Sequence, residues 1–368
     1  MSGTFDIAVV GGGLVGSALA FGLQRQGARV VLFDPPDDDL HASVGNFGLV
    51  WVQGKGLGAP AYAALTRRSA HAWTAFAAEI GAHSGSDPAY RQCGGARIAL
   101  SDEELEACRD SVRRMHNQGG AEDISILSRA ELLERVPAAG PEAVGAVWCP
   151  LDGHADPLAT HLSLRATIGA GGRTRIVRER VTELAPDGAG FALMAGGERF
   201  VAEKVVLAAG LGTTDLAARL GLDVPLKPQR GQVLVTARQA PFLDVACHTV
   251  RQTSQGTVMI GDSKEDVGFD RGTTAGIGSG IAARAVRMFP ALAEMRIVRQ
   301  WGALRVMSPD GLPIYAQSEE HPGAMAVTCH SGVTLAAAHA GEVAEAVLSG
   351  TLAERYQAFS PRRFEEAA

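Results

Sequence analysis

The segment 5–34, FDIAVVGGGLVGSALAFGLQRQGARVVLFD, constrains the fold more than any other part of this 368-residue chain. An apolar run typical of a strand leads into glycines at G-x-G-x-x-G spacing. A helical pattern follows, and a second apolar run ends at an acid. We expect Gly11 to make the tight turn, Gly13 to let the backbone approach a pyrophosphate, and Gly16 to let helix and strand pack closely. Asp34 stands where a carboxylate holds the hydroxyl pair of a ribose. The segment therefore predicts a dinucleotide-binding unit.

This fingerprint does not separate FAD from NAD, but the residues after it favour FAD. An NAD dehydrogenase would continue as a regular βαβ series, whereas residues 35–58 are rich in glycine and carry the polar residues Ser43, Asn46 and Gln53. Long irregular segments in compact domains are usually functional. We expect this one to fold over a flavin ring and to offer hydrogen bonds to its edge; a surface loop is the alternative. Its GKGLG stretch (54–58) lacks the form of a phosphate-binding lysine loop.

Two later segments complete the expected cofactor domain. Residues 175–210 read as a small meander of strands that closes on VVLAAG. Residues 324–350 predict a strand, a junction at Ser331-Gly332, and an alanine-rich helix that ends at Gly350. The N-terminus of that helix would face the flavin edge on which negative charge develops. His330, at the junction, reads either as a packed histidine or as a catalytic one.

Composition excludes several classes of protein. A net charge of −6 without a Lys/Arg block argues against nucleic acid as a partner. The five cysteines are scattered, which argues against a disulfide framework, a metal site or an iron–sulfur centre and favours a reducing compartment. No apolar run approaches ~18 residues, and the first run is broken by glycines, unlike a signal peptide. We expect a cytoplasmic protein, attached to the inner membrane only through partners.

The stretch WGALRVMSPDGLP (301–313) places an arginine in an otherwise apolar strand. Alternation puts Arg305 on the same face as Trp301 and Ala303. A guanidinium is expensive to bury unless it meets an anion, and its planar fork matches a carboxylate. The pattern favours a carboxylate-binding residue; an internal salt bridge is the alternative.

Together these motifs resemble the flavoproteins of the D-amino-acid oxidase, glycine oxidase and sarcosine oxidase group. The matching stretches run nearly from end to end: VVGGGLVGSALA (9–20), GHADP (153–157), VVLAAG (205–210), PQRGQVLV (228–235), GALRVMSPDGLPI (302–314) and HSGVTLAAAHA (330–340). Within the group, GNFGLVWVQGKG (45–56) is most similar to the FAD (beta) subunits of opine oxidase, D-hydroxyproline dehydrogenase and hydrogen cyanide synthase.

The resemblance implies an α/β fold in which a Rossmann-like, two-dinucleotide FAD domain is interleaved with an antiparallel-sheet substrate domain of α+β type. We expect the discontinuous FAD domain to comprise residues 1–85, 150–225 and 310–368, and the substrate domain residues 86–149 and 226–309. It implies no metal ligand. The FAD-binding residues that it implies are Gly11, Gly13, Leu14, Val15, Gly16, Asp34, Ser43, Asn46, Phe47, Gly48, Val181, Ala209, Gly210, Ser331, Gly332, Val333 and Thr334.

The resemblance also implies roles in catalysis for Arg305, Trp301 and His330. In related enzymes, the arginine of G-x-R-x-x-[ST]-P-D-G grips the substrate carboxylate beside the flavin, and Trp301 would help to wall the pocket. The chain departs from sarcosine oxidases at two positions. Ala303 replaces a cysteine that binds flavin covalently, so we expect non-covalent FAD. Met259 replaces a lysine that activates oxygen, which favours a dehydrogenase. Lys264 is close in sequence, so an oxidase remains an alternative.

The predicted reaction is FAD-dependent oxidation of the C–N bond of a D-amino acid, D-hydroxyproline or an opine. A hydride would pass from Cα to flavin N5, and electrons would pass to a partner subunit or a quinone-linked acceptor. A free-standing oxidase that releases hydrogen peroxide is one alternative, and a non-catalytic flavin electron-transfer or assembly subunit is another. An opine would need a second cationic contact, for which Arg251, Arg230 and Arg97 are candidates.

Overall fold

The N-terminal fingerprint forms the centre of an eight-stranded sheet in the computed structural model, which describes residues 4–36, 42–119 and 123–365. Strand β1 (Phe5–Val10) lies between β2 (Val30–Phe33) and β11 (Glu198–Leu207) and runs parallel to both. The order across the sheet is β17-β18-β11-β1-β2-β8, and β10 and β9 continue from β11 as an antiparallel meander. The other strands of this sheet are β8 (Thr174–Val177), β9 (Val181–Asp187), β10 (Gly190–Ala195), β17 (Ile314–Gln317) and β18 (Ala324–Thr328).

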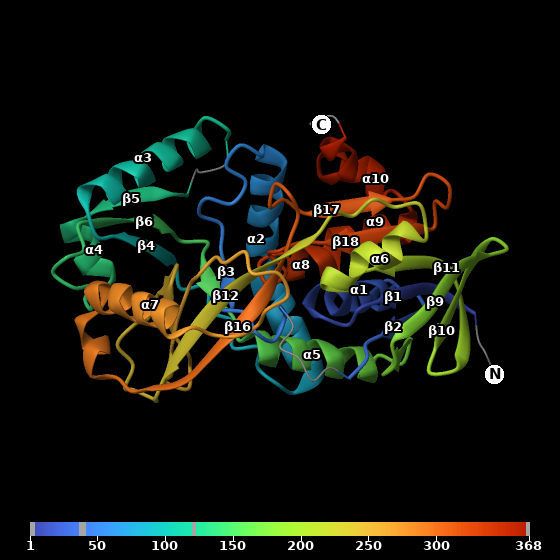
Figure 1. Ribbon diagram of the computed structural model, residues 1–368, viewed down its shortest axis with the longest axis horizontal. Helices are drawn as coiled ribbons and strands as arrows, with labels where there is room; N and C mark the ends of the chain where they lie inside the picture. Colours follow the sequence, from blue (N-terminus) through green and yellow to red (C-terminus); the bar gives the residue numbers. More distant parts are fainter. Residues whose placement is uncertain (1–3, 37–41, 120–122, 366–368) are drawn as a thin grey trace.

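Both faces of this sheet are covered, which explains why its strands are apolar throughout. Ile7 and Val9 of β1 pack into a core with the long helices, whereas Ala8 and Val10 pack with the meander. These helices and the C-terminal ones lie beside the sheet in Figure 1. They are α1 (Leu14–Arg25), α2 (Pro60–Ser84), α5 (Pro157–Ala170), α6 (Thr213–Ala218), α8 (Ala336–Ala338), α9 (Ala344–Ser349) and α10 (Leu352–Arg355), with short turns η1 (Gly210–Gly212), η4 (Gln357–Phe359) and η5 (Pro361–Phe364).

Two four-stranded sheets form the other end of the molecule, at the left of Figure 1. One, in the order β14-β15-β12-β16, is wholly antiparallel, and the other, β13-β4-β6-β5, is antiparallel except between β13 and β4. A shared core that includes Ile98, Trp148, Leu234 and Met288 joins them. The first contains β12 (Lys227–Thr236), β14 (Val250–Gln252), β15 (Val258–Ile260) and β16 (Ile297–Met307); the second contains β4 (Gly95–Ala99), β5 (Ser125–Ser128), β6 (Gly145–Cys149) and β13 (Ala246–Cys247). The helices here are α3 (Asp102–His116), α4 (Arg129–Arg135) and α7 (Ala275–Met288), with the turn η2 (Pro290–Glu294).

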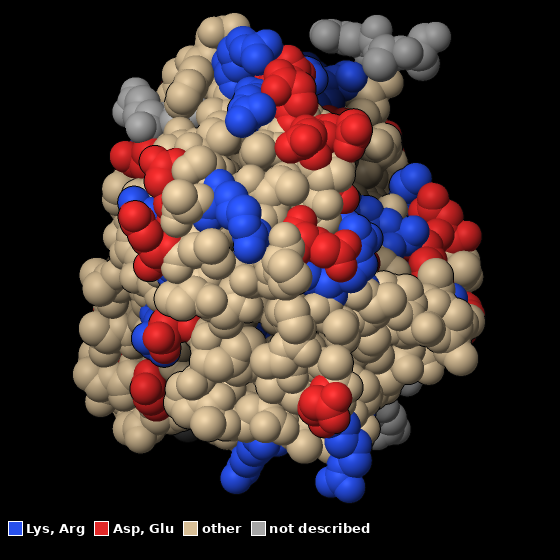
Figure 2. All heavy atoms as spheres, turned by 90° about the vertical axis from the view of Figure 1, so that its left-hand side faces the viewer, with Lys and Arg blue, Asp and Glu red and all other residues tan. Residues whose placement is uncertain are grey.

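The predicted fold class is confirmed, since a mostly parallel, helix-covered sheet is interleaved along the chain with antiparallel sheets. The domain boundaries stay a prediction. A two-stranded ladder of β3 (Leu49–Val50) and β7 (Gly153–His154) lies between the two parts of the molecule in Figure 1. On the surface at the end that faces the viewer in Figure 2, acidic and basic side chains are intermixed.

The C-terminal helix differs from its prediction. Regular helix begins at Ala336, after a turn, and is interrupted by a wider π-type turn, η3 (His339–Val343), before α9 ends at Gly350 with a φ of 74°. The interruption coincides with a close approach to α1. A Cβ atom on Gly22 would lie 2.2 Å from the carbonyl oxygen of Ala340, and that oxygen accepts a 3.0 Å hydrogen bond from Arg25 Nη2. A carbonyl released from the helical ladder is typical of such turns.

We predict that Gly22→Ala destabilises the protein by about 1–3 kcal/mol, because the added methyl group would overlap backbone rather than a movable side chain. The matched control is Gly280→Ala in α7, where nothing lies within 4 Å of the added Cβ and better helix propensity should give a gain of up to about 1 kcal/mol. Urea unfolding followed by circular dichroism measures both. Equal midpoints for the two variants would contradict the prediction.

Candidate active site

The glycine loop after β1 has the geometry that a pyrophosphate needs. Gly11 has a φ of 105°, and a Cβ atom there would lie 2.4 Å from the carbonyl oxygen of Ala208, at the end of β11. A Cβ atom on Gly16 would lie 1.8 Å from the carbonyl oxygen of Gly11. Helix α1 begins directly after this loop, and its first amide, that of Leu14, donates to Ser43 Oγ at 2.9 Å. Strand, turn and helix N-terminus therefore make a cradle that suits a phosphate group.

Asp34 lies at the carboxyl end of β2 beside this loop. A Cβ atom on Gly12 would lie 2.4 Å from Asp34 Cγ, and Asp34 Oδ2 pairs with Arg165 Nη1 of α5 at 2.5 Å. His161 Nε2, from the same helix, lies 2.6 Å from the carbonyl oxygen of Gly12. Binding of a ribose by Asp34 stays a prediction. Sequence reasoning missed Arg165 and His161 because no local pattern links α5 to the fingerprint.

The glycine-rich segment after β2 is mostly loop, as expected, although residues 37–41 lie outside the described ranges. Its amide side chains are less free than we expected. Asn46 Oδ1 accepts the backbone N–H of Gly48 at 2.7 Å, which closes a turn. Gln53 is 7% exposed and its Nε2 donates to Asp152 Oδ2 and to the carbonyl oxygen of Gly95. The amide nitrogen of Gln53 thus holds the loop to β4 and to the turn before β7, and a contact between Gln53 and a flavin edge stays a prediction.

Arg305 reaches across strand β12 through a gap left by a glycine. Strand β16 pairs with β12 so that Ala303 lies opposite Gly231. A Cβ atom on Gly231 would lie 2.4 Å from Arg305 Nη2. Arg305 Nη1 donates to the carbonyl oxygen of Ser263 at 2.9 Å and Nη2 forms an ion pair with Asp262. One edge of the guanidinium is therefore fixed by backbone, and the other meets a carboxylate. The side chain remains 22% exposed.

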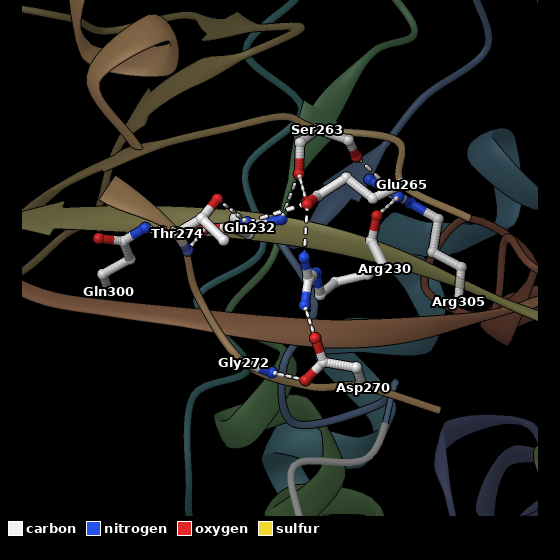
Figure 3. Close-up of polar contacts among 9 residues, drawn as sticks. All are labelled: Arg230, Gln232, Ser263, Glu265, Asp270, Gly272, Thr274, Gln300 and Arg305. Carbon is white, nitrogen blue, oxygen red and sulfur yellow. Dashed lines mark hydrogen bonds and ion pairs between the residues drawn. The ribbon is translucent and has the colours of Figure 1, made fainter. Parts of the chain in front are cut away.

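A buried polar network holds the segment that fixes Arg305 (Figure 3). Arg230, whose side chain is 4% exposed, lies between Glu265 (2.7 Å) and Asp270 (2.5 Å). Backbone hydrogen bonds in both directions join Arg230 to Glu265, and Gln232 Nε2 donates to Glu265 Oε1 at 3.0 Å. The hydrogen bond from Arg230 is the main reason that the pKa of Glu265 falls to about 2. Arg230 is thus committed to the protein and is not a free contact for substrate.

Trp301 and Met259 also make contacts that the sequence did not indicate. Trp301 Nε1 donates to the carbonyl oxygen of Gly45 at 3.1 Å, which ties β16 to the glycine-rich loop. Met259 Sδ lies 2.9 Å from Nη2 of Arg251, which is 2% exposed and whose Nε donates to the carbonyl oxygen of Phe47. Burial lowers the pKa of Arg251 to about 10. The Met259 position therefore has a guanidinium beside it, although it lacks the lysine of sarcosine oxidases.

The C-terminal junction is organised around the hydroxyl of Ser331. This hydroxyl accepts hydrogen bonds from Lys55 Nζ and from Tyr62 Oη (2.7 Å), and it lies 3.2 Å from His330 Nδ1. Because both oxygen lone pairs are used, the remaining hydroxyl proton goes to Nδ1, which requires a neutral imidazole. The positive charge of Lys55, followed by burial, holds the pKa of His330 well below its usual value, in agreement with this arrangement.

The rest of the junction packs between two other segments. Gly332 faces the side chain of Val15 in α1, and a Cβ atom on it would lie 3.4 Å from Val15 Cγ2. From α2, Trp73 Nε1 donates to the carbonyl oxygen of Val333 (3.0 Å) and Ser69 Oγ to that of Thr334 (2.7 Å). The structure therefore brings this junction to the glycine loop. The side chain of Val181 belongs to the apolar core of the meander, and a contact between this residue and FAD stays a prediction.

A protein-family model described as "FAD dependent oxidoreductase" matches residues 6–346. The chain belongs to this family. The B subunit of opine oxidase from Rhizobium meliloti is 43% identical over 98% of both chains, and its counterpart from Agrobacterium tumefaciens is 42% identical over 98% of this chain and 97% of that one. The crystal structure of glycine oxidase from Geobacillus kaustophilus superposes with a TM-score of 0.85 and 25% identity, covering 96% of this chain and 95% of that one.

These matches confirm the resemblance found in the sequence, including its narrower part, and make FAD the cofactor of this oxidoreductase. The glycine loop and α1 would hold the pyrophosphate of FAD, and the Ser331–Thr334 junction lies against the same end of α1. Within the described ranges, no helix is long and apolar enough to cross a bilayer. Sequence reasoning also missed four residues around Arg305 and Ser331, namely Gly231, Asp262, Lys55 and Tyr62.

We predict that Glu265→Gln destabilises the oxidoreductase by about 3 kcal/mol at pH 7, because it leaves a buried guanidinium short of a charged partner. The native pKa of Glu265, about 2, lies below its usual value of 4.5. Its contribution is therefore complete above about pH 5 and is lost as the pH falls toward 2. Urea unfolding at pH 7, 5 and 3 should show wild type and variant converging at acidic pH. Glu198→Gln, in an exposed pair with Arg175, should cost less than about 1 kcal/mol. A gap that does not depend on pH would contradict the assignment.

Proposed function

We propose that this enzyme oxidises the C–N bond of an amino acid or an N-substituted amino acid of the opine type, with Arg305 binding the substrate carboxylate. The observation that carries the proposal is the environment of the Arg305 guanidinium. Its inner edge is fixed by the carbonyl oxygens of Ser263 and Arg230, and its outer edge already accommodates a carboxylate, that of Asp262. A substrate carboxylate would displace Asp262, which belongs to a partly exposed loop.

The residues of the site would act mainly by orientation and charge. Arg305 would hold the substrate with its Cα and amine in one orientation, which removes much of the entropic cost of reaction. Positive charge from Arg305 would lower the pKa of the substrate amine and so increase the neutral form that can react. FAD, when bound, supplies the hydride acceptor. Because His330 is neutral, it adds no positive charge to the site, and its ring would form part of the pocket wall.

The names of the relatives support an enzyme of several subunits, because both opine oxidase relatives are B subunits. We propose that electrons leave through a partner subunit or a quinone-linked acceptor. We also propose that the protein is cytoplasmic and reaches the inner membrane only through such partners. A carboxylate-binding arginine has no use in a pure electron carrier or assembly subunit, which makes that alternative the weaker one.

An oxygen-using oxidase is the second candidate, and one observation favours it. The guanidinium of Arg251 beside Met259 supplies positive charge at the position from which we expected it to be missing. A fixed cation near the reacting centre stabilises the negative charge that forms on oxygen. Hydrogen peroxide formed by the purified chain in air, at a rate equal to substrate oxidation, would establish the oxidase and exclude the dehydrogenase.

We predict that Arg305→Lys weakens substrate binding about 10- to 100-fold, because a point charge replaces a planar fork. Gly231→Ala should act in the same direction, since its methyl group would displace the guanidinium. Asp262→Asn should strengthen binding a few-fold, because it removes a competing carboxylate. The measurement is anaerobic bleaching of the flavin by a panel of opines, D-amino acids, D-hydroxyproline and sarcosine. If no compound bleaches the wild-type flavin, the proposed function is wrong; unaltered binding in Arg305→Lys would reject the role of Arg305 alone.

We predict that FAD is released intact when the protein is precipitated with acid, because Ala303 offers no sulfur to the cofactor. The yellow colour should appear in the supernatant, where chromatography identifies FAD. Flavin that remains in the pellet would show a covalent bond and would point to one of the two partly exposed cysteines, Cys93 or Cys329.

A further inference from the structure

We propose that the ammonium of Lys55 binds a second carboxylate of the substrate, distinct from the one that Arg305 binds. The inference rests on the proposed function and narrows it. The substrate class would be secondary amines with a carboxylate on each side of the nitrogen, that is, N-(carboxyalkyl) amino acids, in preference to amino acids with one carboxylate.

The backbone around Lys55 is shaped to present this side chain. Lys55 lies between Gly54 and Gly56, which have φ values of 69° and 76°, and its N–H donates to the carbonyl oxygen of Val52 at 3.0 Å. A Cβ atom on Gly56 would lie 2.3 Å from the amide nitrogen of Ala63. The turn is therefore packed against the start of α2 and cannot shift toward it. From this turn the lysine side chain reaches Ser331 at the junction.

No acid neutralises Lys55 among the described residues. Its ammonium makes no ion pair there, and the Ser331 hydroxyl is its one hydrogen-bond partner in those ranges. Two of its three N–H groups therefore remain for a ligand. Asp152 is close enough to raise the pKa of Lys55, but its two oxygens accept the backbone N–H of Val52 and the amide of Gln53. Burying part of a cation without a counter-charge costs free energy, and a bound anion would offset this cost.

The charges of Lys55 and Arg305 influence the same two histidines, His330 and His248. The positive charges of Lys55, Arg305 and Lys264 all lower the pKa of His330, and the same three lower that of His248. Burial, together with Arg305 and Lys264, lowers the pKa of Lys55 to about 8, so its ammonium persists at neutral pH. Among the residues that the structure describes, the ion-pair partner of Asp262 is Arg305. A substrate with one carboxylate would leave Lys55 unmatched, whereas a second carboxylate would match it.

The three arginines considered from the sequence suit this role less well. Arg230 is held by two acids, and Arg251 is 2% exposed and bonded to Met259 and Phe47. Arg97 is exposed on β4, where its charge lowers the pKa of His248. Of these four residues, Lys55 is the one that combines a position at the Ser331 junction with N–H groups not used by described residues. It is a specificity residue, and its removal should change substrate preference rather than the reaction.

The test compares two substrates that differ by one carboxylate: an N-(1-carboxyethyl) amino acid and the N-ethyl form of the same amino acid. Lys55→Met keeps most of the length of the unbranched side chain and removes its charge. We expect the rate of anaerobic flavin bleaching at limiting substrate to fall about 10- to 100-fold for the first compound and to stay within about 3-fold for the second. Lys55→Arg should retain most of the preference. Lys204→Met, on β11, is the control and should change neither rate.

A binding measurement separates this inference from the proposed function. Diglycolate and methoxyacetate are unreactive ethers with two carboxylates and one, and each is titrated against the flavin absorbance of the holoenzyme. Tighter binding of diglycolate that disappears in Lys55→Met supports the second carboxylate site, even if no amine bleaches the flavin and the proposed reaction is wrong. Equal losses for both ligands, with a shifted flavin spectrum, would show that Lys55 serves the cofactor instead. That result, or unchanged affinities in Lys55→Met, overturns the inference.

Discussion

The position of the Arg305 guanidinium depends on the missing side chain at residue 231. Strand pairing places Gly231 opposite Ala303, and only the bare backbone of β12 lets the arginine lie across it. The segment that receives the guanidinium is fixed in turn by the buried Arg230–Glu265 pair. This pair joins residues 263–265 to strand β12. Such a pair gains little stability over apolar residues, so its value here lies in fixing a geometry.

The parts of the site that could be predicted from the sequence are the parts encoded by local patterns. The strand–glycine–helix unit at residues 5–34 predicts its own turn, because Gly12 and Gly16 meet atoms of the same unit and Gly11 meets the end of β11. The alternation in 301–313 predicts that Arg305 shares a face with Trp301. Both are statements about neighbours in sequence, which period and turn chemistry describe well.

The parts that could not be predicted depend on contacts between distant segments. Asp262, Lys55 and Arg165 reach the site from three separate parts of the chain, and no spacing rule relates them to Arg305 or to the fingerprint. The turn at η3 was missed for the same reason, since it coincides with the packing of Gly22 against Ala340, which is distant in sequence. For Lys55 one local signal existed: it is a lysine between two glycines, which let the backbone take the turn that presents the side chain.

The charge of the site runs against that of the whole chain. The protein carries a net charge of −6, yet Arg305, Lys55 and Lys264 influence the same pair of histidines. Cations gathered in this way attract an anionic substrate. They attract a positively charged amine product less strongly. The fully buried carboxyl of Asp152, whose pKa burial raises to about 7, accepts bonds from Val52 and Gln53, the residues just before Lys55. An acid from the turn before β7 thus fixes the loop that carries Lys55, while the ammonium forms no ion pair with any described residue. A site for an external carboxylate requires this arrangement.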